Sequence, residues 1–553
     1  MGFINKKKHS TKKVFIIITL FMILSVISVY FTHLYHGEII VGDDFQFHKN
    51  RIEGLYEALK IHNFFPKINM VFMNSMGYAS SIFYSDFFLY FPALLRLLGF
   101  SLAESYIAFV IVINFVTFII AFASHFLVIK DQRKSLIFSL LYTLSSYRLL
   151  DLTTRAALGE VLAICFLPLA FMGLYQIIYG NSKKWYYLTL GMALIIHAHI
   201  LSAVMFSLLI VLFLVVNVKR MFFEKERLIS IVKAAFLTVP LIVSYLFPVL
   251  EQLASQTFKV SSNPIFFMSE KASQLGNAFL NALSNKSTPN IGITLLLLTI
   301  FYVLSMKKIK AKTIFCMGLL LLGLTTDLFP WKILDHTFLN TIQFPWRFLA
   351  FATLLLSWVI GEDPLNLFEN KKVFYTLSIL ITVFTLSYTL NLRSQVEAEK
   401  IVSYGEYNQI NSYKIGAGKE YLPDKANFED LMNKKEELIY DSSKLTIKNY
   451  HKNKDVIIFD YQALSKELVT VPLIYYKGYV GELSGKGTIS EPFLNEAEAG
   501  LTSVAVEGTG TVKIYYKDTL IQKLSQWVSI ASWILLLSYL FVIKRRQIRE
   551  DKR

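Results

Sequence analysis

The sequence predicts an all-α polytopic membrane protein of about twelve transmembrane helices, with a small extracellular β-rich domain. Three observations support this fold class. Hydrophobic residues make up 54% of the 553 residues and charged residues only 17%, a composition typical of membrane proteins. Apolar spans recur along the chain, and short Lys/Arg clusters stand beside them. The net charge of +16 therefore indicates orientation in a bilayer and not nucleic-acid binding.

The first apolar span covers about 14–35 and follows a lysine-rich segment without a cleavage pattern, so we expect an uncleaved helix with a cytoplasmic N-terminus. If successive spans cross the membrane in alternating directions, both termini of this multi-pass cell-membrane protein lie in the cytoplasm. The further spans are expected at about 103–129, 134–150, 156–179, 184–199, 200–218, 229–250, 291–306, 312–328, 345–361, 372–390 and 526–543.

The charges between the spans test this topology. The loops expected on the inner side are basic, except for the loop at 361–372, which is about neutral. Since basic loops remain on the cytoplasmic side, the charge pattern favours the proposed orientation. Those loops read KDQRK, GNSKK, VKRMFFEKER, MKKIKAK, GEDPLNLFENKK and KRRQIREDKR.

Three regions follow from this topology: a transmembrane domain at 1–390, an extracellular domain at 391–525, and a last helix with a basic tail at 526–553. Within the first region, 36–102 form a long external loop. Residues 391–525 contain short alternating runs typical of β-strands, separated by polar loops. These runs are Leu445–Lys448, Val456–Tyr461, Val469–Tyr479 and Val512–Tyr516.

The external loop contains GDDFQFHKNRIEGLYEAL, which predicts a helix beginning near Asp43. Asp44, His48 and Arg51 then recur at i, i+4 and i+7 on the apolar face. Charged groups on a packing face are costly unless they are paired or needed. A structural ion pair with a capping aspartate is one interpretation, and a catalytic carboxylate is the other. The opposite face is expected to carry Lys49, Asn50, Glu53, Glu57 and Lys60.

Other polar residues also fall near the outer ends of spans, and few charges lie deep in the bilayer. A pump or proton relay would place some of them there, so we expect any chemistry to face the cell exterior. The two cysteines both lie in apolar spans and suggest neither a disulfide framework nor a zinc site. The outer polar residues include Asp86, Asp151, Arg155, Glu160, His197, His199 and Arg347.

Four stretches resemble a known family: GDDFQFHKNRIEGLYEAL with the following FPKIN, MGYAS and FYSDFFLYFPALLRLLG; YRLLDLTTRAALGE; FPWRFLAF; and VPLIYYKGY. The arrangement resembles the GT-C superfamily of membrane glycosyltransferases and, within it, the YfhO-like group of 6-pyruvoyl-tetrahydropterin-synthase-related membrane proteins. The resemblance implies an essential acid in the first external loop and a polyprenyl-phosphate-linked sugar as donor. It also implies a cell-surface polymer, such as teichoic acid or wall polysaccharide, as acceptor.

Such a reaction requires a carboxylate base for the acceptor hydroxyl and positive charge for the leaving phosphate. One displacement inverts the anomeric centre, so a pair of catalytic carboxylates is not required. Asp44 occupies the D of the family's D-x-x-F-H pattern and is our choice for the base. Asp43 is the alternative, and it could instead cap the helix.

His48 and Arg51 are candidates for binding substrate. His48 could orient the aspartate or bind a sugar hydroxyl, and an imidazole satisfied in the core is as plausible. Arg51 could bind phosphate, or pair with Asp44 and weaken it as a base by lowering its pKa.

The resemblance extends the substrate- and phosphate-binding candidates to Arg155, Glu160, His199 and Arg347. Arg155 could equally form a structural pair with Asp151, four residues earlier. Arg347 beside a tryptophan could be an interfacial anchor. No metal-ligand spacing is evident. Because some GT-C enzymes use a divalent ion, a metal remains possible.

Two rival functions suit the same composition. A transporter or flippase of lipid-linked sugar would show inverted repeats and interrupted helices, and neither is clear here. A non-catalytic wall-polymer assembly protein would use 391–525 for binding. The aromatic segments 86–100 and 103–129 are expected to contact lipid, and part of them could hold a polyprenyl tail. Pro92 and Arg96 make the first of these segments interfacial or re-entrant.

Overall fold

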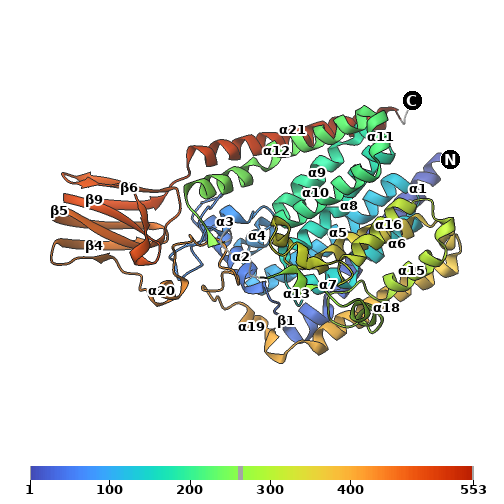
Figure 1. Ribbon diagram of the computed structural model, residues 1–553, viewed down its shortest axis with the longest axis horizontal. Helices are drawn as coiled ribbons and strands as arrows, with labels where there is room; N and C mark the ends of the chain where they lie inside the picture. Colours follow the sequence, from blue (N-terminus) through green and yellow to red (C-terminus); the bar gives the residue numbers. More distant parts are fainter. Residues whose placement is uncertain (1, 260–265, 551–553) are drawn as a thin grey trace. The chain divides into compact units, whose positions relative to one another are not determined.

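The computed structural model describes residues 2–259 and 266–550, which fold as two compact units (Figure 1). The first unit combines Met1–Phe45, Gly99–Thr238 and Pro264–Gln409, and the second combines Gln46–Leu98, Val239–Asn263 and Ile410–Arg553. Most of the external loop, which the sequence prediction joins to the transmembrane domain, thus belongs to the unit that contains the C-terminal sheet.

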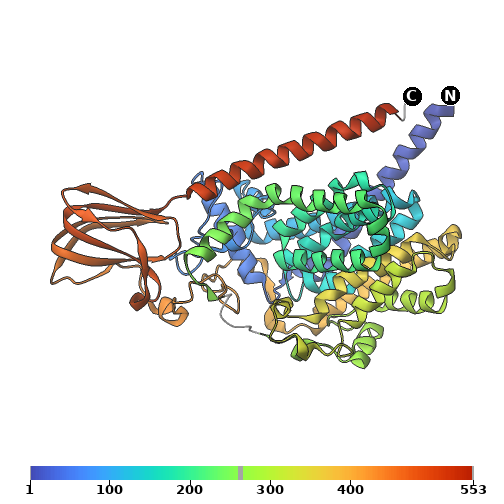
Figure 2. The same cartoon turned by 45° about the horizontal axis from the view of Figure 1, so that its top comes forward.

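The first unit is almost entirely helical (Figure 2). Its short 3₁₀ segments include η7 (Phe338–Ile342) and η8 (Pro345–Arg347), and β1 (Glu38–Ile40) pairs with β2 (Ile401–Ser403). Its helices are α1 (Gly2–Ile27), α5 (Leu102–Ile129), α6 (Gln132–Thr143), α7 (Ser146–Leu152), α8 (Leu158–Tyr179), α9 (Tyr186–Ala198), α10 (Ile200–Val216), α11 (Val218–Phe223), α13 (Met268–Lys271), α14 (Leu275–Leu283), α15 (Ile293–Leu304), α16 (Lys312–Gly323), α17 (Phe348–Glu362), α18 (Lys371–Gln395) and α19 (Tyr404–Tyr407).

Every predicted span contains a helix, but the helices differ in length. Among the described residues, five helices are long and apolar enough to cross a membrane, or six if the pair Lys13–Ile27 and Tyr30–Gly37, bent by 49°, forms one span. The figure of twelve crossings stays a prediction. The five helices that are long and apolar enough are Leu102–Ile129, Leu158–Tyr179, Lys225–Ser255, Lys371–Gln395 and Leu520–Arg546.

The span expected at 134–150 is wrong as one continuous helix, because α6 ends at Thr143 and α7 begins at Ser146. Arg148, which is fully buried, stabilises this break. Its guanidinium donates to the carbonyl oxygen of Thr143 at 3.1 Å and to the hydroxyl of Thr117 at 3.0 Å. A cation at the carboxyl end of a helix compensates carbonyl groups that lack helical partners. The break directs the chain into the loop that precedes α8.

The second unit contains a seven-stranded antiparallel sheet, which confirms the predicted β-rich region near the C-terminus. The long strands β5 and β9 pair at its centre, and β5 alternates buried and more exposed side chains along Val456–Ala463. Phe72, Tyr78 and Phe459 belong to the core beneath this sheet. The strands are β3 (Ile439–Tyr440), β4 (Leu445–Asn453), β5 (Val456–Ile474), β6 (Tyr479–Gly485), β7 (Thr488–Ile489), β8 (Phe493–Asn495) and β9 (Leu501–Tyr516).

The polar helix of the external loop is α2 (Phe45–Lys60), so it begins just after Asp44. The expected polar face is partly wrong: Lys49 and Asn50 are fully buried. The Asn50 amide donates to the carbonyl oxygen of Asn411 at 2.7 Å, and burial lowers the pKa of Lys49 to about 8. The apolar face alone did not reveal that the helix is enclosed on more than one side.

The second unit also contains α3 (Ser80–Phe83), α4 (Tyr90–Leu97), α20 (Phe428–Asn433) and α21 (Leu520–Glu550), and α12 (Lys225–Ser255) passes from the first unit into the second.

Helices α8 and α9 approach each other closely because glycines line their contact. A Cβ atom on Gly173 would lie 2.2 Å from the backbone nitrogen of Leu188, and one on Gly191 would lie 2.6 Å from the Cα atom of Ala170. Small residues are the usual means by which membrane helices approach this closely.

We expect Gly173→Ala to lower the free energy of unfolding by about 1–3 kcal/mol, because the added methyl group must push two helix backbones apart. The measurement is the thermal unfolding of the detergent-solubilised protein. Gly276→Ala is the matched control, since a Cβ atom there meets open space, and its effect should remain within about 1 kcal/mol. Equal melting of the two variants would contradict the close packing of α8 on α9.

Candidate functional site

The segment Gly42–Asp44 is held by backbone hydrogen bonds to two distant parts of the first unit. After β1, the amide of Val41 donates to the carbonyl oxygen of Lys400 at 2.8 Å. The amides of Asp43 and Asp44 donate to the carbonyl oxygens of Thr154 and Arg155 at 3.1 and 2.9 Å. The backbone positions of both aspartates are therefore set by the loop that joins α7 to α8.

Gly42 permits this close approach. A Cβ atom on it would lie 2.3 Å from the carbonyl oxygen of Thr153 and 2.7 Å from that of Thr154. Real Cβ atoms do not approach backbone oxygens so closely, so a side chain here would displace the two aspartates that follow.

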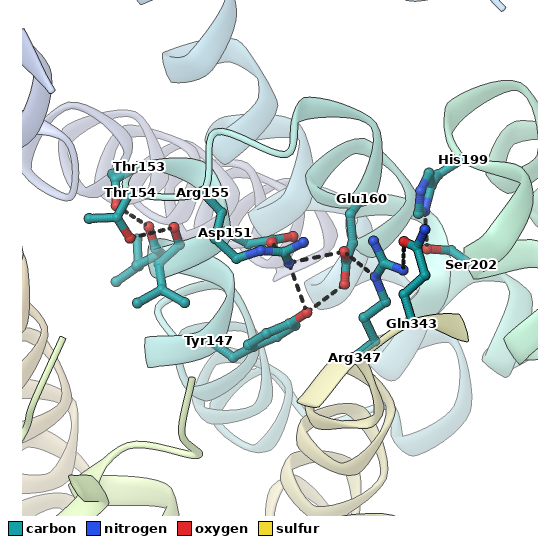
Figure 3. A network of polar contacts seen from close by, with 12 residues as sticks. Tyr147, Asp151, Thr153, Thr154, Arg155, Glu160, His199, Ser202, Gln343 and Arg347 are labelled. Carbon is teal, nitrogen blue, oxygen red and sulfur yellow. Dashed lines mark hydrogen bonds and ion pairs between the residues drawn. The ribbon is translucent and has the colours of Figure 1, made fainter. Parts of the chain in front are cut away.

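A buried cluster of charged groups lies beside this loop (Figure 3). Glu160, in the first turn of α8, is its centre: one carboxylate oxygen accepts from Arg155 at 3.2 Å and from Arg347 at 3.2 Å. The other oxygen accepts from the hydroxyl of Tyr147 at 2.6 Å. We call Tyr147, Asp151, Arg155, Glu160 and Arg347 the arginine–carboxylate cluster.

Each arginine of the cluster also has a second anchor. Arg155 forms an ion pair with Asp151, four residues earlier, so the structural pair considered from the sequence is present. The same guanidinium also contacts Glu160. Arg347 ends η8 and donates to the carbonyl oxygen of Ile342 at 2.7 Å and to the side-chain oxygen of Gln343 at 3.1 Å. These bonds hold both guanidinium groups in fixed orientations.

The charge balance of the cluster depends on Asp151. Burial raises the pKa of this carboxyl group well above its ordinary value, and the negative charge of Glu160 raises it further. One of its oxygens, Oδ2, is buried and has no hydrogen-bond partner within 2–259 and 266–550. Protonation of Asp151 would leave two arginines facing one carboxylate, and the cluster would carry net positive charge.

Asp44 and Asp43 differ in their surroundings, although both are exposed. The protein still desolvates the carboxyl group of Asp44, and this raises its pKa. The positive charges of Arg155 and Arg347 oppose that rise, whereas Asp43 adds to it. Asp43 faces solvent, with 64% of its side chain exposed, and forms a 3.5 Å ion pair with Lys400. The charges of Arg155, Glu160 and Arg347 therefore influence Asp44.

His199 lies on the same side of the first unit, at the junction of α9 and α10, where the backbone leaves the helical conformation. Its Nδ1 atom lies 2.9 Å from the hydroxyl of Ser202 (Figure 3). His197, two residues earlier, is buried within α9. The structure therefore brings Asp44, Arg155, Glu160, His199 and Arg347 into one unit.

His48 and Arg51 belong to the second unit instead. The ion pair that the structure gives Arg51 is with Asp86 at 2.9 Å, and its guanidinium lies 4.1 Å from the ring centre of Tyr84. A nitrogen of Arg51 also lies 3.3 Å from Nδ1 of His48. Arg51 therefore forms an ion pair with an acid of the external loop other than Asp44.

Metal binding has no evident ligand set. Within residues 2–259 and 266–550, no group of three or more His, Cys, Asp or Glu side chains is arranged to hold a metal ion. Two acids of the site, Asp151 and Glu160, are paired with arginines.

Three contributors were absent from the candidates identified in the sequence: Tyr147, Ser202 and Gln343. Tyr147 had a usable signal, because Tyr147, Asp151 and Arg155 recur at intervals of four, which places them on one helical face. Ser202 and Gln343 are common polar residues at helix boundaries and gave no such signal.

Residues 82–394, more than half of the chain, match the family described as 6-pyruvoyl-tetrahydropterin synthase related domain, membrane protein. The chain belongs to this family. A protein of Lactococcus lactis subsp. cremoris (strain MG1363), described as an uncharacterized protein, is 27% identical over 355 residues. That match covers 60% of this chain and 56% of the relative.

The part of this 6-pyruvoyl-tetrahydropterin synthase related membrane protein that matches the family contains the whole arginine–carboxylate cluster. It does not contain Asp43, Asp44 or the C-terminal sheet. The family match therefore says nothing about the candidate base.

We expect Arg155→Met to lower the free energy of unfolding by about 3–5 kcal/mol, because it leaves two buried carboxyl groups without their shared cation. The test is thermal unfolding of the purified protein in detergent. Lys400→Met is the matched control: its ion pair with Asp43 is exposed, so its loss should cost about 0–1 kcal/mol. A similar small effect of both substitutions would mean that the cluster is solvated and not buried.

Proposed function

We propose that this family member is an integral membrane glycosyltransferase that moves a sugar from a polyprenyl-phosphate donor to a cell-surface polymer. The observation that carries the proposal is the position of Asp44. Its carboxyl group is exposed, its pKa is raised by desolvation, and two arginines, the buried Arg347 and the partly buried Arg155, act on it electrostatically. A base and a source of positive charge are the two groups that such a transfer requires.

In the proposed reaction, the carboxylate of Asp44 accepts the proton of an acceptor hydroxyl group. The hydroxyl oxygen attacks the anomeric carbon, and the bond from that carbon to the phosphate oxygen breaks. The polyprenyl phosphate leaves with the bonding electrons, and the anomeric centre is inverted because only one displacement takes place. Since Asp44 is exposed, it can return the proton to solvent.

The arginine–carboxylate cluster would favour the leaving phosphate. Arg155 and Arg347 are held by hydrogen bonds to neighbouring groups, so they need little reorganisation when negative charge develops. The two guanidinium groups supply the positive charge that suits a phosphate, and because the pKa of Asp151 is raised, uptake of a proton by this carboxyl group would increase the net positive charge of the cluster.

Further parts of the proposal come from the sequence. The basic loops favour cytoplasmic termini and an extracellular site, and about twelve crossings accord with that topology. A cell-surface glycopolymer such as teichoic acid or wall polysaccharide is the acceptor that the resemblance to GT-C enzymes implies. The C-terminal sheet is a candidate for contacting this polymer.

Asp44→Asn should abolish transfer or reduce it by about 10²–10⁴, because the acceptor hydroxyl loses its base, while the protein remains folded. The measurement compares the sugar content of isolated surface polymers from cells that carry the intact gene, the variant or no gene. Asp43→Asn is the matched control and should retain transfer. Loss with Asp43→Asn alone would assign the base to Asp43, and normal glycosylation with both variants would favour a carrier or an assembly protein.

The rate of transfer should fall as the pH falls through the pKa of Asp44, because only the carboxylate accepts a proton. Since that pKa is raised, the acid limb should lie above the ordinary value for aspartate, about 3.9. Asp43→Asn removes a neighbouring negative charge that raises the pKa, so its acid limb should move to lower pH.

This pH profile is measured on membranes from cells that carry the intact gene or a variant. The membranes are supplied with the lipid-linked sugar that the wild-type protein transfers. Glu397→Gln is the matched control: this exposed acid contacts Lys400 at 3.9 Å and should leave the acid limb in place. An acid limb that moves equally in both variants would contradict the role of Asp44 as the group that titrates.

A further inference from the structure

The first unit contains a cavity of about 240 Å³ among α14, α15, α16 and the start of α17. Its wall is mostly apolar, and it is open at one side, where Leu275 and Phe279 are 49% and 43% exposed. Leu296, Leu319, Leu322 and Leu349 contribute to the apolar wall.

Three polar side chains of the wall, Asn290, Thr325 and Thr326, have partners within the protein. The hydroxyl groups of Thr325 and Thr326 donate to backbone carbonyl oxygens of α16 at 2.7 and 2.8 Å. The side chain of Asn290 donates to two backbone oxygens and accepts from the amide of Gly292 at 2.8 Å. The described residues of the wall include no charged side chain, so the cavity is poorly suited to a sugar or a phosphate.

One donor of the wall is unsatisfied. The indole nitrogen Nε1 of Trp346 is buried and has no hydrogen-bond partner among the residues that the structure describes. Its ring stacks on Phe344 with the ring centres 4.5 Å apart, which fixes its orientation. A buried N–H group without a partner is unfavourable, and an acceptor supplied by a ligand would remove that cost.

We propose that this cavity holds a hydrocarbon segment of a membrane lipid, with one lipid oxygen accepting a hydrogen bond from Trp346. The apolar wall favours a chain over water, because apolar cavities of about 150 Å³ in proteins stay dry and bind small hydrocarbons. A volume of 240 Å³ holds a segment of one chain but no complete lipid, and the open side gives the remainder a way out. Hydrocarbon chains are the ligands that surround a membrane protein.

Both an acyl lipid and a polyprenyl phosphate offer this chemistry, since each has an oxygen at the start of its chain. The inference does not depend on the reaction proposed above, because occupancy of the cavity can be measured without turnover. If the cavity takes the polyprenyl chain, it deepens that proposal.

Gly323→Leu tests the cavity directly. Gly323 lines the cavity, and a Cβ atom there meets nothing within 4 Å, so a leucine fills the space without displacing the helix. Gly276→Leu is the matched control, because it also meets open space but does not line the cavity. Ala278→Leu is a second filling variant from another helix, in case Gly323→Leu fails to fold.

The measurement is native mass spectrometry of the full-length protein in detergent, titrated separately with phosphatidylglycerol and with a polyprenyl phosphate. At least one of the two lipids should bind, and Gly323→Leu and Ala278→Leu should lower its retention at least tenfold, whereas Gly276→Leu should not. Trp346→Phe keeps an aromatic side chain but removes the N–H donor, and it should weaken binding by about 2- to 10-fold.

Retention of polyprenyl phosphate alone would assign the cavity to the proposed donor, and retention of phosphatidylglycerol would assign it to a bilayer lipid. Equal retention by wild type and both filling variants would overturn the inference. Asp44→Asn should retain lipid as wild type does, so a failure of the proposed reaction and a failure of this lipid site are distinguishable.

Discussion

The pairing of Glu160 with two arginines is the interaction on which the arrangement of the site depends. A carboxylate and two guanidinium groups buried together are tolerable only when each finds opposite charge and hydrogen bonds. Arg155 comes from the loop before α8, Glu160 from its first turn, and Arg347 from η8 before α17. The cluster therefore fixes the two helix starts against each other, and their polar ends share one location.

The same loop that supplies Arg155 also anchors the two aspartates. Its backbone oxygens accept from the amides of Asp43 and Asp44, and the absence of a side chain on Gly42 allows this approach. These hydrogen bonds involve only the backbone, so the two carboxylate groups can lie in different surroundings. Asp43 turns to solvent and Lys400, whereas Asp44 remains within the electrostatic influence of the arginines.

Trp346 and Arg347 are consecutive residues with different surroundings. Arg347 turns toward the arginine–carboxylate cluster, and Trp346 lines the apolar cavity. The motif FPWRFL thus joins a charged environment to an apolar one over a single peptide bond. This adjacency is what an amphipathic lipid with a charged head and an apolar chain would require.

The sequence by itself determined the positions of the apolar helices, the existence of a β-rich region near the C-terminus, and most of the polar residues that gather in the first unit. These features follow from local patterns: apolar length, alternation, and the spacing of four that joins Asp151 to Arg155. Asp44 was proposed as the base through its place in a motif, and the structure shows that its side chain is exposed and not packed in the apolar face.

Only the tertiary structure decided which candidates meet. His48 and Arg51 share the helical face predicted for Asp44, yet the ion pair of Arg51 is with Asp86, 35 residues later. Glu160 and Arg347 are 187 residues apart and form an ion pair. Local periodicity cannot specify such pairs, because the packing of the helices sets the distance between the two side chains. The cost of burying an unpaired charge then selects which side chains become partners.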